Sequence, residues 1–394
     1  MTILIKAGRF IDGTGAAPQE NICLLVQDGK IVEIAAHLDA PEGCETLDFS
    51  DKTIMPGMMN THVHLGSPAV GDSDTLTRDW NYVDRSLYAV HCLDTYIRSG
   101  VTQVRSLGTR DYLDIKFKNA AKKGAHKWPG IITAGPLICM SGGHGWRGGR
   151  EIDGVDEARK AARQVIREGA DFVKFSATGG VMTPGVEPGS PQLTFPEMEA
   201  LCFEANKAGK RSATHAQGSG GILDAVKAGV TSVEHGIFLT DEIIALMIEK
   251  GTWLVPTLAA PYNIVKHGLE GGIPEYAVRK ANMIIGAHNE SFRNAYKAGV
   301  KIAMGTDAGT PFNEHGESWF ELKLMCENGM TPMEAIVVTT KNAAELLDID
   351  KDYGTLEPGK YADFIVLAAN PLENLETLSD VKATYRHGVC YYQV

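Results

Sequence analysis

Two histidines separated by one residue, His62 and His64, end an apolar run at residues 54–61. Alternate side chains of an extended strand point to the same face, so both imidazoles can approach one metal ion at a strand end. Such a pair is also common as two solvated or hydrogen-bonded rings. Its meaning depends on whether other parts of the chain supply further ligands.

Further side chains that can bind metal stand at the ends of four other strand-like runs. Every member has an ordinary alternative as a hydrogen-bonded polar group, but five such places on separate strands are a poor fit to coincidence. If the strand ends converge, they form one site. The candidate metal ligands are His62, His64, Lys174, His215, His235 and Asp307.

Lys174 is unusual because it lies inside the apolar segment 171–175. A buried ammonium needs a partner or a changed charge. Burial near metal cations favours the neutral amine, which can add carbon dioxide to give a carbamate on Lys174 that bridges two ions. The alternative is an ordinary lysine that reaches an acidic neighbour.

Short β-branched runs alternate with helix-like segments between about residues 56 and 350 and must position these side chains. Expected helices are 155–168, 196–207, 241–250 and 274–297, several followed by glycine. Expected strands are 58–65, 101–106, 130–134, 172–176, 212–216, 232–235, 253–257 and 301–305. Eight alternations predict an α/β chain folded as a (β/α)8 TIM barrel, with a doubly wound open sheet as the alternative.

Both ends of the chain show strand alternation with turn pairs such as Asp28-Gly29. We expect one small β-sandwich built from both termini, comprising residues 1–56 and 351–394. The catalytic barrel would then cover residues 57–350. A length of 394 residues accommodates this arrangement.

The formal net charge of −11 leaves no basic excess to hold phosphates, which argues against nucleic-acid or anionic-membrane partners. Seven cysteines without a paired motif indicate reduced core residues. No stretch approaches the length of a membrane span, and the amino terminus lacks a signal-peptide core. We expect a cytoplasmic enzyme with a small-molecule substrate, and a homo-oligomer.

Together these motifs resemble the amidohydrolase superfamily, in particular its two-metal members with a carboxylated lysine. The likeness extends to residues 25–31 and 354–363, so it covers nearly the whole chain. It implies two divalent ions, expected to be Zn²⁺, although the same donors suit manganese, iron and cobalt. It also implies one metal at His62, His64 and Asp307, the other at His215 and His235, and Lys174 between them.

Two glycine-rich segments, 141–145 and 177–180, are similar to the branch that contains Xaa-Pro dipeptidases. The expected function is hydrolysis of a small amide or dipeptide by a metal-bridging hydroxide. Cyclic-amide or aryl-amide hydrolysis, as in imidazolonepropionase-like enzymes, is the alternative. A deaminase is disfavoured because the third residue after His215 is Gly218 and not glutamate. A relative without catalytic activity is disfavoured by the complete ligand set.

The expected roles extend beyond the ligands. Asp307 would carry the proton from the attacking water to the leaving nitrogen, and His144 would reach the substrate carbonyl from its loop. Arg147 and Arg150 are candidates for binding a substrate carboxylate, or are simply solvated. Glu234 should point to the opposite face from His235 and be structural. The Gly- and Pro-rich loop 179–191 is expected to line the substrate pocket.

Overall fold

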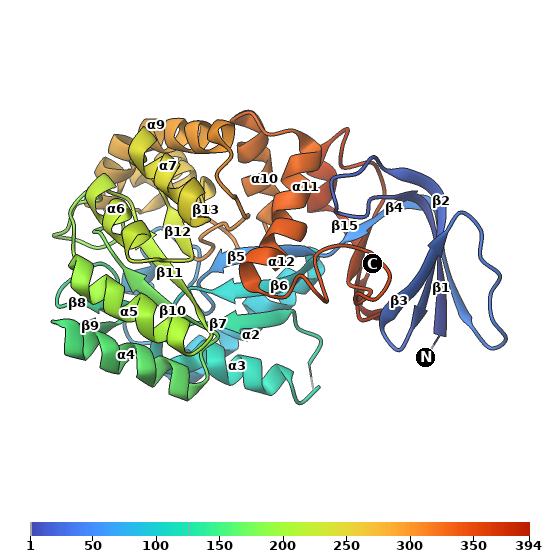
Figure 1. Ribbon diagram of the computed structural model, residues 1–394, viewed down its shortest axis with the longest axis horizontal. Coiled ribbons are helices and arrows are strands. Elements are labelled where there is room, and N and C mark those ends of the chain that lie inside the picture. The colour runs from blue at the N-terminus through green and yellow to red at the C-terminus, as the bar shows by residue number, and fades with distance from the viewer. Residues whose placement is uncertain (1, 125) are drawn as a thin grey trace.

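The computed structural model describes residues 2–124 and 126–394, so Met1 of the expected terminal unit lies outside the described residues. The fold is mixed α/β (Figure 1). Parallel strands surrounded by helices fill one part of the molecule, and a sheet that contains both chain ends forms the other.

Two parallel sheets form the interior of the larger part. Their strand orders are β5-β6-β7 and β13-β12-β11-β10-β8-β9. Nearly every residue of β5, β6, β10, β11, β12 and β13 is buried, as expected for strands covered on both faces. The strands are β5 (Met58–Val63), β6 (Val101–Ser106), β7 (Gly130–Thr133), β8 (Ile138–Met140), β9 (Arg150–Ile152), β10 (Phe172–Ser176), β11 (Arg211–Ala216), β12 (Ser232–His235) and β13 (Trp253–Val255).

Backbone hydrogen bonds link the two parallel sheets at both sides. The Asp171 N–H donates to the Thr133 carbonyl (2.7 Å), and the Leu254 N–H donates to the Lys301 carbonyl (2.8 Å). The Thr61 N–H in β5 donates to the Met304 carbonyl (3.0 Å). The expected strand 301–305 is reduced to a single bridge at Ile302, because the Met304 carbonyl accepts from β5 and the Met304 N–H donates to the carbonyl of Val338 in a later helix. The closed barrel stays a prediction.

The four expected helices are confirmed within one residue at each end, and Gly169, Gly251 and Gly299 end three of them with positive φ. The helices are α1 (Ser73–Leu76), α2 (Tyr82–Arg98), α3 (Leu113–Ala121), α4 (Val155–Glu168), α5 (Phe195–Lys207), α6 (Ser219–Lys227), α7 (Asp241–Lys250), α8 (Ala259–His267), α9 (Glu275–Ala298), α10 (Ser318–Glu327), α11 (Pro332–Thr339) and α12 (Lys341–Leu347). Three short 3-10 helices are η1 (Arg110–Tyr112), η2 (Leu269–Gly271) and η3 (Leu375–Ser379).

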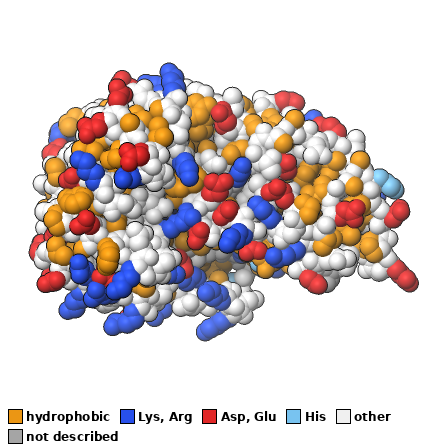
Figure 2. All heavy atoms as spheres, in the orientation of Figure 1, with side chains coloured by type: hydrophobic (Ala, Val, Ile, Leu, Met, Phe, Trp, Pro, Cys, Tyr) orange, Lys and Arg blue, Asp and Glu red, His pale blue; other side chains and the backbone are white. Residues whose placement is uncertain are grey.

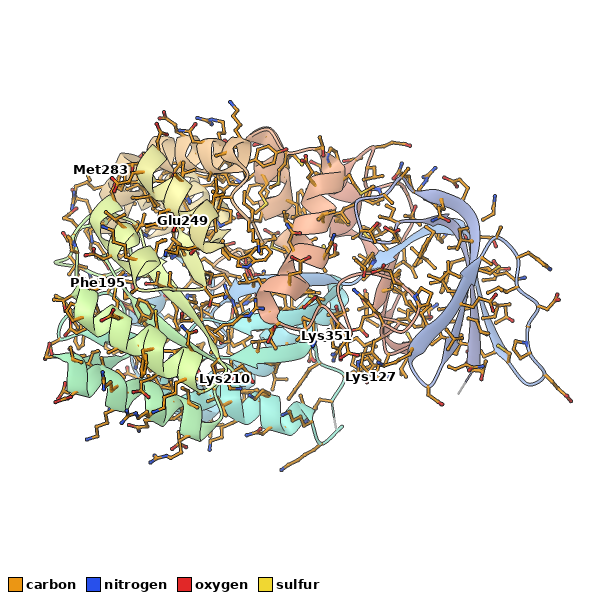
Figure 3. All side chains as sticks on the ribbon, viewed as in Figure 1. Lys127, Phe195, Lys210, Glu249, Met283 and Lys351 are labelled. Atoms are coloured by element: carbon orange, nitrogen blue, oxygen red, sulfur yellow. The ribbon has the colours of Figure 1, made fainter. Side chains whose placement is uncertain are left out.

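Strands from both termini share one seven-stranded sheet of order β16-β15-β14-β4-β1-β2-β3, as the sequence predicts. Lys127, labelled in Figure 3, ties this sheet to the loop before β7 by donating to the Cys390 carbonyl (2.7 Å). The strands are β1 (Thr2–Phe10), β2 (Gln19–Gln27), β3 (Lys30–Ala35), β4 (Glu45–Pro56), β14 (Phe364–Leu367), β15 (Val381–Arg386) and β16 (Val389–Gln393). The expected sandwich and the domain boundaries stay predictions.

Acidic and basic side chains are interspersed over the face shown in Figure 2. This distribution agrees with the absence of a basic excess in the sequence. Within residues 2–124 and 126–394, no helix is long and apolar enough to cross a membrane.

Candidate metal centre

Three buried side chains from distant parts of the chain meet at the ends of the parallel strands. His62 of β5, His235 of β12 and Asp307 each offer a ligand atom, and these atoms lie within 4.8 Å of one another. Asp307 Oδ1 lies 3.2 Å from His62 Nε2 and 3.0 Å from His64 Nε2. Burial raises the pKa of Asp307, but the two imidazoles outweigh it and hold that pKa well below its usual range. The strand ends therefore converge as expected.

The backbone turns sharply where two of these ligands project. His235 has φ of +75° and Asp307 has φ of +61°, and Thr257 beside them has φ of +54°. Residues other than glycine rarely adopt this left-handed conformation. Strain of this kind is concentrated at functional sites, where the surrounding packing enforces it.

Lys174 in β10 is 2% exposed, and its Nζ has no hydrogen-bond partner. Burial lowers the pKa of this amine to about 8, with Arg105 acting in the same direction and Glu234 and Asp307 opposing it. The alternative of a lysine bonded to an acidic neighbour is therefore not observed. A buried amine without a partner, beside histidines and a carboxylate, fits a site completed by a group that is not protein.

His215 and His235 are the other expected ligands, and both are buried. The ring of His215 lies edge-on to that of His235, with centroids 4.6 Å apart. Burial is the largest cause of a lowered pKa at both imidazoles, so they are neutral near pH 7. The Thr257 hydroxyl lies 2.7 Å from His235 Nδ1 and leaves Nε2 for a ligand. Neutral imidazole is the form that binds metal ions.

The expected orientation of Glu234 is wrong. Its carboxylate points inward, accepting bonds from His62 Nδ1 (2.8 Å), Arg105 Nη2 (2.8 Å) and the Ser232 hydroxyl (2.6 Å). Simple alternation fails because the positive φ of His235 also turns that ring inward. Burial raises the pKa of Glu234, but Arg105 and His62 hold it below its usual range. Glu234 orients His62, a structural role typical of carboxylates behind metal-binding histidines.

A cavity of about 300 Å³ opens onto these residues. Among the expected substrate residues, His144 and Arg147 line it, whereas Arg150 does not. The Arg150 guanidinium contacts Gln164 instead, so we do not retain Arg150 as a substrate ligand. His144 stacks on His215 with ring centroids 4.0 Å apart, and burial lowers the pKa of His144 to about 4.

The loop 179–191 contacts these rings directly. The Gly179 carbonyl lies 3.2 Å from His215 Nε2, and the Thr183 hydroxyl lies 3.0 Å from His144 Nδ1. A Cβ atom at Gly180 would lie 2.5 Å from His144 Cε1 and 2.8 Å from His215 Cε1, so only glycine fits there. The expectation that this loop lines the pocket agrees with Val181, Met182, Thr183 and Pro184 in the cavity wall.

Sequence reasoning missed Arg105, Thr257 and His288. Arg105 lies in β6, which is fully buried although more than half of its other residues are polar, so the sequence around it carries a weaker signal than that around Lys174. His288 of α9 lines the cavity, and its Nε2 donates to the carbonyls of Pro256 (2.8 Å) and His235 (3.1 Å). No spacing in the sequence connects His288 to the expected metal ligands, because it comes from α9 and not from a strand end.

The geometry and the comparisons agree on a class of protein. The model of the Amidohydrolase family matches residues 53–390, so this chain belongs to that family and is a hydrolase that acts on amide bonds.

Individual relatives indicate which branch of the Amidohydrolase family this chain resembles. The chain is 30% identical to ochratoxinase of Aspergillus niger over 96% of its own length and 84% of that protein. A crystal structure of a Xaa-Pro dipeptidase with bound methionine superposes with a TM-score of 0.94 at 33% identity, covering both chains completely. A prolidase complexed with N-methylphosphonate-L-proline gives a TM-score of 0.93 at 27% identity, also over both complete chains.

Proposed function

We propose that this chain is a metal-dependent dipeptidase of the Xaa-Pro type. The observation that carries the proposal is the unpartnered, buried Nζ of Lys174 beside His62, His235 and Asp307. The Xaa-Pro dipeptidase and the prolidase among the similar structures support the choice of substrate.

The proposed cofactor is a pair of divalent ions, with Zn²⁺ as the first choice, held by His62, His64, His215, His235, Asp307 and a carbamate on Lys174. When bound, such ions supply Lewis acidity and lower the pKa of water, which favours hydrolysis at neutral pH. The donor set suits them because it combines neutral imidazoles with carboxylate oxygen.

The protein's own side chains supply proton transfer and orientation. Asp307 accepts the proton from the attacking water and delivers it to the leaving nitrogen. His144, neutral near pH 7 with its pKa of about 4, donates to the substrate carbonyl without introducing a charge. Its stacking on His215 and its contact with Thr183 fix the ring. Preorganisation of this kind lowers the cost of orienting polar groups in the transition state.

The two parallel sheets are proposed to form one (β/α)8 barrel, with the terminal strands as the small sandwich beside it. The bonds from Asp171 to Thr133 and from Leu254 to Lys301 support closure. Ligands on β5, β10, β11 and β12 then lie at the carboxyl ends of barrel strands, where such enzymes place their chemistry. The homo-oligomer and the cytoplasmic location stay predictions.

The test is hydrolysis of a dipeptide library by protein of measured metal content. We expect cleavage of Xaa-Pro dipeptides, loss of activity after chelation and recovery after adding Zn²⁺. The likeness to ochratoxinase favours one second candidate, an aryl-amide hydrolase, so ochratoxin A and an imidazolone belong in the same panel. Activity on those compounds without dipeptide cleavage would replace the proposed substrate, and full activity in metal-free protein would contradict the mechanism.

A further inference from the structure

Three arginines line the cavity beside the candidate metal centre: Arg85, Arg110 and Arg147. Arg147 is compensated, because its guanidinium pairs with Asp74. Among the described residues, no carboxylate lies within 4 Å of the Arg85 or Arg110 guanidinium. Two cations in the wall of one cavity are therefore left without a direct counter-ion.

The fold holds both side chains in the cavity wall. Arg85 lies in α2, and its Nη2 donates to the carbonyl of Thr77 (2.8 Å), another lining residue. Arg110 begins η1 and packs on the loop that carries His144. A Cβ atom at Gly148 of this loop would lie 3.2 Å from Arg110 Cγ and Nε, which shows that the Arg110 side chain packs closely on the loop backbone.

The backbone after Arg110 is strained. Asp111 and Tyr112 are consecutive residues with positive φ, at +54° and +57°. Each costs of the order of 1–3 kcal/mol for a residue that is not glycine. The turn that they make returns the chain to α3 and leaves Arg110 facing the cavity.

The charge of this region favours an anion. The lining groups outside the metal centre are three cations against the carboxylates Asp72 and Asp74, which leaves one positive charge. Burial is the largest cause of a lowered pKa at Arg85, and the neighbouring Arg110 acts in the same direction. Asp111, Asp74 and Asp84 oppose this only at longer range. An anion that contacts both guanidiniums would relieve their repulsion.

We propose that Arg85 and Arg110 bind the free carboxylate of the substrate's carboxyl-terminal residue. The inference rests on the proposed function and assigns its specificity for a free carboxyl terminus. It replaces the expected pair Arg147 and Arg150. Guanidinium groups suit this task because their planar donors match a carboxylate. The preferred substrates are then dipeptides with a free terminal carboxylate, and the corresponding carboxamides are poor substrates.

The first experiment compares Ala-Pro with Ala-Pro amide as substrates of Arg85→Met and Arg110→Met. We expect wild type to prefer Ala-Pro, and each variant to lose roughly 10- to 100-fold in kcat/KM on Ala-Pro, the range for a hydrogen bond to a charged group. Hydrolysis of the amide should change less than about threefold. Lysine at either position should recover part of the loss. Arg159→Met, an exposed change on α4, is the control and should leave both substrates unaffected.

A second experiment separates this inference from the proposed function. Binding of L-proline and L-prolinamide is measured by calorimetry in the metal-loaded wild type and both variants. If wild type cleaves neither dipeptide but binds L-proline more tightly than the amide, and the variants lose that preference, the carboxylate site stands and the dipeptidase proposal fails. Three results would overturn the carboxylate site. Wild type could show no preference for L-proline, or the variants could keep that preference unchanged. The third is an equal loss of kcat/KM on Ala-Pro and Ala-Pro amide in the variants.

Discussion

At the residue scale, Lys174 lowers the stability of the fold while it contributes an amine to the candidate site. Its amine is buried and has no hydrogen-bond partner, while Glu234 nearby is already engaged by Arg105 and His62. A cation in this position is costly without a compensating group. The proposed carbamate on Lys174 would remove this cost, because it replaces the ammonium group.

Replacing Lys174 by methionine should separate these two effects. Because the pKa of about 8 lies below the ordinary value of 10.5, protonation of Lys174 destabilises the metal-free fold as the pH falls from 10.5, and the loss is complete below about pH 8. Lys174→Met should therefore raise the free energy of unfolding of metal-free protein at pH 7 by about 1–3 kcal/mol, while metal content and turnover fall close to zero. Urea unfolding and elemental analysis measure both. A variant that retains two ions per chain would exclude Lys174 as a ligand.

At the residue scale the sequence predicts the convergence of His62, His235 and Asp307 because each stands near the end of an expected strand or just after it. It cannot predict the inward turn of both Glu234 and His235, since that depends on a positive φ enforced by packing. For a similar reason, nearness in the chain does not show which arginines line the cavity. Arg147 and Arg150 are near His144 in the chain, whereas Arg85 and Arg110 reach the cavity from α2 and η1.

At the scale of elements, α9 holds the loop 179–191 against the candidate metal centre. Lys280 of α9 is 1% exposed, and its Nζ lies within hydrogen-bonding distance of four loop carbonyls, those of Gly180 (3.3 Å), Val181 (3.5 Å), Thr183 (2.7 Å) and Val186 (2.5 Å). The Gly180 and Thr183 segments contact His144 directly. One ammonium group thus substitutes for regular secondary structure in a segment too rich in glycine and proline to form any.

Lys280→Met should release this loop. We expect kcat/KM to fall roughly 10- to 100-fold, because several buried carbonyls lose their donor and His144 loses its support. The loop should also become sensitive to limited proteolysis. Arg279→Met is the matched control, since Arg279 pairs with Glu187 of the same loop at the exposed surface. We expect this change to alter the free energy of unfolding by less than about 1 kcal/mol. Equal effects of the two variants would contradict the anchoring role.

His315 joins α2 to the loop after β5 and gives the fold a pH dependence. Tyr96 donates its hydroxyl to His315 Nδ1 (2.9 Å), and His315 Nε2 donates to the Ser67 carbonyl (2.9 Å), an arrangement that requires the neutral ring. Burial lowers the pKa of His315 to about 4 from 6.5. The unfolded chain therefore binds more protons between these values, and the stability from this group is present above pH 6.5 and lost towards pH 4.

Comparing wild type with His315→Gln in the metal-free state tests whether His315 causes this loss of stability at low pH. Between pH 6.5 and pH 4 wild type should lose up to about 3 kcal/mol more unfolding free energy than the variant. His144 and His288, whose pKa values are also lowered, are common to both proteins and cancel. A variant with the same pH slope as wild type would show that His315 is not the titrating group.

At the scale of the whole molecule, β14 couples the terminal sheet to the parallel strands. Its alternate residues face two cores: Ile365 and Leu367 pack with Tyr96 and Val101, whereas Phe364 and Val366 pack inside the terminal sheet. The Thr384 hydroxyl adds a bond to the Ile97 carbonyl (2.8 Å). The sequence predicts the shared sheet from strand alternation at both ends, but not this packing, which no local pattern encodes.

Gly100, between α2 and β6, lies at this junction and tests whether the two parts unfold together. Its φ is +80°, and a Cβ atom would lie 3.0 Å from both Ile365 Cγ2 and Val381 Cγ2. Gly100→Ala should destabilise the protein by about 2–4 kcal/mol, from backbone strain and overpacking combined. Gly229→Ala, with φ of +86° and nothing within 4 Å of the added atom, should cost only the strain, about 1–2 kcal/mol. Because Ile365 and Val381 of the terminal sheet belong to the same core as the parallel strands, calorimetry should show a single transition that moves to lower temperature as a unit in Gly100→Ala. Two transitions, with only one of them shifted, would mean that the terminal sheet unfolds independently of the parallel strands.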